Sequence, residues 1–253
     1  MVIRHWARAV RGGLGFLTRL PVGHHDGDWD AFRSTPGAFP IVGLVAGSLA
    51  AIPLLAADTA SPATVTFGYL LAVYAVMGTH HVDGVADLGD ALVVHGDVSR
   101  RREVLTDTTT GVGAILAVVI VVAGLALGGL GLAELPVPEA VGVAIATEIG
   151  AKLAMAAMAC FGTASHDGMG KQFTDESTPG GFVVPSAAVL VAATLAWPSP
   201  AAVAVCGAVA GVALPWYLAN RHLGGISGDI FGAANEIGRV AGVHAGVIAW
   251  TLL

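Results

Sequence analysis

Charged residues are scarce in this sequence. Only 12% of its 253 residues are Asp, Glu, Lys or Arg, whereas a soluble domain normally carries about 25%. A globule of this length needs a polar surface that so few charges cannot supply, so a soluble domain is excluded. Hydrophobic residues make up 55% of the chain and its mean hydropathy is +0.76. We therefore expect lipid to solvate much of the surface.

Aromatic residues (6%) and cysteines (two) are also few. The apolar residues are mostly Ala, Val, Leu and Gly, and such small residues let membrane helices approach closely. Cys160 and Cys206 form no CxxC motif and lie in apolar segments, so we interpret both as buried apolar side chains. A net charge of −6 argues against a nucleic-acid partner.

Hydropathy predicts an all-α, polytopic transmembrane bundle that forms one integral-membrane domain over residues 1–253. Each apolar segment is near the ~20 residues that cross ~30 Å of hydrocarbon. We expect about seven such segments, and they cover residues 38–57, 63–79, 112–132, 140–160, 182–197, 201–219 and a shorter stretch at 240–253.

The connections between these segments differ in charge. The short ones, 58–62, 133–139 and 198–200, contain no Lys or Arg. The N-terminal arm and the polar regions 80–111, 162–180 and 220–239 hold every Lys and Arg except Lys152. Because cytoplasmic loops carry an excess of Lys and Arg, we predict a multi-pass protein of the cell membrane with these polar regions in the cytoplasm.

The N-terminal stretch 2–22 is amphipathic. Trp6, Val10, Leu14 and Leu17 are spaced like one face of a helix, and the nearby arginines lie largely off that face. This pattern predicts an interfacial helix along the cytoplasmic membrane surface. The alternative is a solvated helix packed on the loops.

The most informative segment is 80–90, where Asp83, Asp87 and Asp90 follow a spacing of i, i+4 and i+7. On a helix these carboxylates fall within ~60° of one another. Clustered carboxylates repel one another unless a cation neutralises them, and oxygen ligands alone favour Mg²⁺ or Mn²⁺. A solvated acidic helix face is the alternative.

Two further regions carry candidate site residues. Arg100 and Asp107 are seven residues apart, which predicts a shared helical face on which Asp107 completes the metal site and Arg100 holds a phosphate oxygen. Near the C-terminus, a glycine-rich run permits close approach of the backbone to a ligand. Its candidate substrate-binding residues are Gly225, Gly228, Asp229 and Glu236.

These motifs resemble the cobalamin synthase family, adenosylcobinamide-GDP ribazoletransferase, over nearly the whole chain. The resemblance rests on a His-x-Asp-Gly-x-x-Asp-x-x-Asp pattern followed by a Gly-Asp loop. Its markers are residues 16–22, with Arg19 as a candidate substrate-binding residue, 39–43, 81–87 with Asp90, 107–111, and 227–229 with Gly232, Ala233 and Glu236.

The resemblance implies that adenosylcobinamide-GDP reacts with α-ribazole, or its 5′-phosphate, to give adenosylcobalamin, or its 5′-phosphate, and GMP. It assigns Asp83, Asp87, Asp90 and Asp107 to one or two Mg²⁺ ions, and His81 to a base or a partner of these ligands. The chain departs from the family at residues 107–109, where Asp-Thr-Thr replaces a frequent Asp-Ser-Arg.

Three questions stay open at this stage. Glu148 and Lys152 either pair inside the bundle or contact substrate. A lipid phosphotransferase that uses CDP-alcohols and a membrane transporter are the alternative functions, although Asp87 replaces an arginine of the first and the carboxylates lie at segment ends rather than at the midplane. Assembly into a homo-oligomer is also left open.

Overall fold

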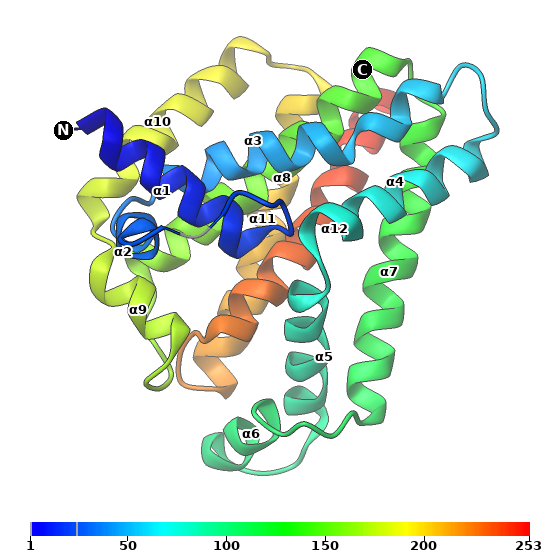
Figure 1. Cartoon of the computed structure of the whole chain (residues 1–253). Coiled ribbons are helices and arrows are strands. Elements are labelled where there is room, and N and C mark those ends of the chain that lie inside the picture. Colours follow the sequence, from blue (N-terminus) through cyan, green and yellow to red (C-terminus); the bar gives the residue numbers. More distant parts are fainter. Residues whose placement is uncertain (1, 24) are drawn as a thin grey trace.

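The computed structural model describes residues 2–23 and 25–253, and the predicted all-α architecture is confirmed there (Figure 1). In that part of the chain, β-type pairing is limited to an isolated bridge between Ala164 and Ile226. The helices are α1 (Val2–Leu17), α2 (Asp28–Arg33), α3 (Ala38–Ala50), the 3₁₀ helix η1 (Ile52–Ala56), α4 (Pro62–Met77), α5 (His80–Val93), α6 (Val98–Leu105), α7 (Val112–Ala133), α8 (Val137–Phe161), α9 (Met169–Glu176), α10 (Pro179–Leu195), α11 (Pro200–His222) and α12 (Gly228–Leu252).

The polytopic membrane character is also confirmed. Within the described residues, four spans are long and apolar enough to cross a bilayer: α3 with η1, α7, α8 and α11. Two bent pairs, α4 with α5 (93°) and α9 with α10 (88°), raise the number to six if each counts as one span. The segment predicted at 240–253 is the second half of α12, which is not among these spans, so the described residues give four to six candidate spans rather than about seven. Helix α12 begins at Gly228 because Ser227 caps it through the backbone N–H of Ile230.

The last helix, α12, lies at the centre of the bundle and packs against α5, α7, α8 and α11. Small residues permit this packing: a Cβ on Gly207 would lie 2.3 Å from the Cβ of Ala245, and one on Gly211 would lie 2.6 Å from that of Ala241.

The two cysteines differ in burial. Cys160 is buried as predicted, whereas the prediction for Cys206 is wrong. Cys206 lies on an exposed side of α11, together with Val209, Ala210, Ala213 and Leu214.

The N-terminal stretch forms the expected helix, α1, and packs on α2 and α3. Gly13 lies against the Phe32 ring, and the Trp6 ring covers Gly37. Much of the apolar face is therefore used inside the protein. The position of α1 along the membrane surface stays a prediction.

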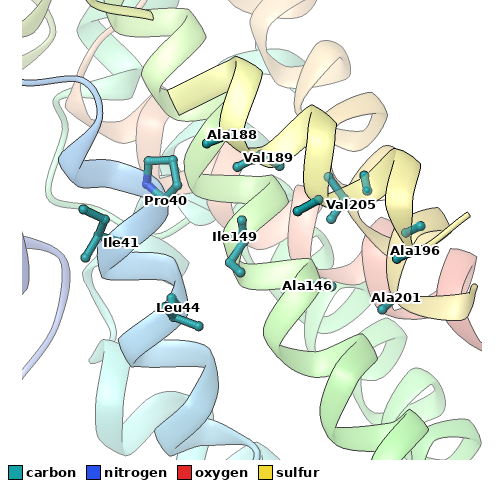
Figure 2. A pocket seen from close by; sticks show the side chains of 13 residues that line it. Pro40, Ile41, Leu44, Ala146, Ile149, Ala188, Val189, Ala196, Ala201 and Val205 are labelled. Carbon is teal, nitrogen blue, oxygen red and sulfur yellow. The ribbon is translucent and has the colours of Figure 1, made fainter. Parts of the chain in front are cut away.

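An apolar cavity of about 350 Å³ opens between α3, α8, α10 and α11 (Figure 2). No ionisable side chain belongs to its lining, so it offers no group for acid–base or metal chemistry. It is lined by Pro40, Ile41, Leu44, Ala146, Ile149, Ala188, Val189, Ala192, Ala193, Ala196, Ala201, Ala202 and Val205.

Candidate active site

The site begins where the chain turns sharply between α4 and α5. Gly78 has φ +76°, a conformation that favours glycine, and ends α4 with its N–H bonded to the Tyr74 carbonyl. Arg19 packs here: its backbone N–H donates to the Val76 carbonyl at 2.7 Å, and its side chain lies against Gly78. The predicted acidic segment therefore leaves the turn as a separate helix.

Two glycines let α5 and the start of α12 cross in backbone contact. A Cβ on Gly84 would lie 2.3 Å from the carbonyl oxygen of Asp229, and one on Gly232 would lie 3.1 Å from the Cα of His81. This crossing sets Asp83 beside Asp229, although the two are far apart in the sequence. Figure 1 shows α7 returning alongside α5 after the short helix α6.

The predicted carboxylates meet in one cavity of about 420 Å³, which we call the acidic cavity. Asp87 is half-buried, and the negative charges of Asp229, Asp83 and Asp90 act on it. Much of the remaining wall consists of Thr106, Thr108, Thr109 and Thr110. Among the described residues, no Lys or Arg lines this cavity. Asp107 lines it as well.

The carboxylates differ in how far the protein already satisfies them. Asp90 accepts the N–H groups of Gly111 (2.6 Å) and Ala114 (2.8 Å), and so caps the start of α7. Asp229 accepts the Ser227 hydroxyl at 3.1 Å. Asp83 and Asp87 accept no hydrogen bond from any described residue, which leaves them available to a ligand.

Oxygen ligands of this kind suit Mg²⁺. Within residues 2–23 and 25–253, however, no three His, Cys, Asp or Glu side chains converge closely enough to hold a metal ion. The donor chemistry fits the predicted cation, and the metal stays a prediction.

The prediction that Arg100 and Asp107 share a helical face is wrong. Helix α6 ends at Leu105, and Asp107 lies in the following loop, where it accepts the N–H of Thr109 at 3.0 Å. That hydrogen bond is the main reason why the pKa of Asp107 is below its usual range, and the charge of Arg100 adds to it. Arg100 itself is exposed and pairs with Glu103 at 2.9 Å.

A second cavity of about 280 Å³, the middle cavity, shares Asp83 and Asp229 with the acidic one. His80, His81 and Gly228 belong to its wall, with Met155, Phe173 and Phe231. A third cavity of about 520 Å³ shares Phe16 and Met169 with the middle one and reaches the ion pair of Arg11 with Asp28. The three cavities therefore adjoin one another along α5, α12 and α1.

Glu236, predicted to bind substrate, lines none of these three cavities. It is buried, and its carboxylate accepts from Arg239 at 2.5 Å. Glu148 and Lys152, for which a pair and a substrate contact were both open, pair inside the bundle at 2.5 Å. Arg239 also binds Glu148.

Sequence reasoning overlooked Arg239 because it placed residues 220–239 in a loop. Arg239 lies in α12, which is not among the candidate spans, but its side chain is fully buried between carboxylates.

The glycines of the C-terminal run have different surroundings. Gly225 has φ +140°, and a Cβ there would lie 2.4 Å from the carbonyl oxygen of Thr163. It therefore fixes the loop before α12. Gly228 has ordinary space around it, with Met169 at 3.4 Å, and lines the middle cavity.

Fold and site together define a polytopic helical membrane protein with an acidic cavity at one end of its bundle, built from α5, the loop before α7 and the start of α12. Residues 9–247 match the family model described as cobalamin-5-phosphate synthase. The chain therefore belongs to the cobalamin-5-phosphate synthase family.

Relatives named adenosylcobinamide-GDP ribazoletransferase agree with this membership. The one from Halorubrum lacusprofundi is 47% identical and covers 96% of this chain and 98% of its own. The one from Halobacterium salinarum is 57% identical over 75% of this chain and 96% of its own. A relative from Pyrobaculum islandicum is 35% identical over 92% of each chain. No solved structure matches the chain significantly. Nothing here favours a lipid phosphotransferase or a transporter.

Proposed function

We propose that this protein transfers the adenosylcobinamide-phosphate group from adenosylcobinamide-GDP to α-ribazole, or to its 5′-phosphate, and releases GMP. The observation that carries the proposal is the acidic cavity: five carboxylates line it in a chain of the cobalamin-5-phosphate synthase family. Asp83, Asp87, Asp90, Asp107 and Asp229 are those residues.

In this reaction a hydroxyl oxygen of the ribazole forms a bond to the phosphorus next to cobinamide. The bond from that phosphorus to the GMP oxygen breaks, and the hydroxyl proton leaves. Phosphoryl transfer of this kind depends on positioning and on neutralising charge. Asp83 and Asp87, which have no hydrogen-bond donor among the described residues, would hold Mg²⁺ with Asp107 and Asp229 nearby. A bound Mg²⁺ supplies charge neutralisation of the diphosphate.

The acidic cavity is proposed to open to the cytoplasm, where both polar substrates are available. Arginines at the same end of the bundle support this orientation. Arg101 donates to the carbonyls of Ala91 and Leu92 near the end of α5, and Arg102 donates to the Leu223 carbonyl just after α11. These cations therefore gather at the helix ends that border the site.

The test is a GMP-release assay on purified protein in detergent with both substrates and a Mg²⁺ titration. We expect Asp83→Asn and Asp87→Asn each to abolish release while the protein stays folded, because each removes a carboxylate that would hold the cation. Asp58→Asn, in the short loop between η1 and α4, is the matched control and should behave like wild type. Absence of GMP release by the wild-type protein would rule out the proposed reaction, and a fully active Asp83 or Asp87 variant at limiting Mg²⁺ would remove that residue from the site.

A further inference from the structure

His81 has one ring nitrogen without a partner. The side chain is only 3% exposed, and it belongs to the wall of the middle cavity beside Asp83 and Asp229. Its Nε2 is buried and bonds to no described residue. Buried polar atoms in native proteins are nearly always hydrogen-bonded, so an unpartnered one in a residue that lines a cavity is a candidate contact for a ligand or a water molecule.

The other ring nitrogen shows which tautomer is present. Nδ1 of His81 lies 3.1 Å from the amide nitrogen of Asn235, and the same amide nitrogen lies 3.4 Å from Oε1 of Glu236. An ionised carboxylate only accepts hydrogen bonds. The amide must therefore turn its NH₂ group to Glu236, since the reversed amide would set two acceptors against each other. The second N–H of that group then donates to Nδ1.

Because Nδ1 accepts, it carries no proton, and a neutral imidazole must carry its proton on Nε2. His81 consequently carries an N–H donor on a buried nitrogen without a partner, in a side chain that lines the middle cavity. A ring in this state has no free lone pair on Nε2, so it cannot take the proton of an attacking hydroxyl.

The partner of Asn235 is itself held in place. Arg239 donates to Oε1 of Glu236 and also to Glu148, and Glu148 accepts from Lys152. These four side chains are at most 1% exposed and carry two negative and two positive charges. Each of these four side chains has an oppositely charged partner within the network. Arg239 thereby holds the Glu236 carboxylate beside Asn235.

We propose that His81 is a hydrogen-bond donor to a diphosphate oxygen of the nucleotide-activated substrate, and that Asn235 is a positioning residue that fixes its Nε2–H tautomer. The proposal rests on the function proposed above, which brings a diphosphate to the cavities that share Asp83 and Asp229. A phosphate oxygen is a strong acceptor, and a pre-oriented donor stabilises the charge that grows on it during transfer. Of the two roles expected for His81, the structure favours the donor over the base.

Substitution by glutamine separates these roles. The amide nitrogen of Gln reaches about as far as Nε2 and can donate a hydrogen bond, but it is no base. We expect His81→Gln to keep kcat within about tenfold of wild type. His81→Leu should lose about 10²- to 10³-fold, which is the usual effect of removing one such donor. His95→Gln, an exposed histidine after α5, is the matched control.

A double-mutant cycle tests Asn235. If Asn235 acts through His81, Asn235→Ala lowers kcat in the wild-type background and has little further effect when His81 is already Leu. A purely structural role would give equal losses of activity in both backgrounds, together with a lower melting temperature, and would overturn the positioning role.

The tautomer is measurable without any variant being active. In protein labelled with ¹⁵N-histidine, the His81 signals, assigned by their loss in His81→Gln, should show a protonated Nε2 and an unprotonated Nδ1. A protonated Nδ1 would refute the inference even if every variant were inactive. So would a folded His81→Gln that is as inactive as His81→Leu. Both results leave the proposed function standing as long as the wild-type protein releases GMP.

Discussion

The contact between α5 and α12 makes a sharp prediction for Gly84→Ala. The new Cβ would lie 2.3 Å from the carbonyl oxygen of Asp229, 3.0 Å from its carbonyl carbon and 3.1 Å from the backbone nitrogen of Ala233. All three are backbone atoms inside a helix, so no side-chain rotation can relieve the clash. The helices must separate.

The separation can be estimated from ordinary contact distances. A carbon approaches a carbonyl oxygen to about 3.3–3.6 Å, so the crossing must widen by roughly 1 Å. Overpacking of this size costs about 1–3 kcal/mol of stability. A displacement of about 1 Å between groups that act together costs about 10²-fold in rate. We therefore expect kcat/KM to fall about 10²-fold, because Asp83 and Asp87 move relative to Asp229.

The assay is GMP release at saturating Mg²⁺, with thermal unfolding measured on the same preparations. Gly232→Ala should show a smaller loss, because its Cβ meets the Cα of His81 at 3.1 Å rather than an oxygen at 2.3 Å. Gly142→Ala in α8 is the control, since its nearest neighbour is Ala201 at 3.9 Å. Wild-type activity in Gly84→Ala, or an equal loss in Gly142→Ala, would contradict the role assigned to the crossing.

Three further outcomes are expected. Asp229→Ala should change the KM for one substrate more than for the other, because Asp229 lines both the acidic and the middle cavity; unchanged KM values with a lower melting temperature would reduce it to a helix cap. In a Cys206→Ser background, His95→Cys should be labelled only from the cytoplasm and Asp58→Cys only from outside, and the reverse pattern would invert the proposed orientation. Gly225→Ala should lower the melting temperature measured by thermal unfolding, because φ is +140° and a backbone oxygen lies 2.4 Å from the new Cβ; an unchanged melting temperature would show that the loop adjusts.

The acidic face of α5 was predictable because carboxylate spacing and helical periodicity agree there. The shared face of Arg100 and Asp107 was not, because Asp and Thr side chains bond to nearby backbone and compete with a helix. Asp107 does so by accepting the N–H of Thr109. The run of threonines after Asp107 was the available signal that α6 had already ended.

Glu236 was misplaced for a related reason. Ser227 followed by Asp229 is a typical helix start, and in the structure α12 does begin at Gly228. Starting the helix there in the sequence would have put Glu236 two turns inside the bundle. Hydropathy could not predict the 93° bend between α4 and α5. It separates apolar segments from polar loops, and neither class fixes the angle between two helices.

A single helix, α12, connects the acidic cavity to the charges buried inside the bundle. Asp229 lies in its first turn at the acidic cavity, and Arg239 follows ten residues later, about 15 Å further along the axis. Two carboxylates and two cations buried around Arg239 gain little net stability over apolar side chains of the same size. They instead restrict the orientation of each side chain, because each charge has an oppositely charged partner within the network. Through Asn235, that arrangement reaches Nδ1 of His81 and leaves the proton on Nε2, in a ring that lines the same cavity as Asp83 and Asp229.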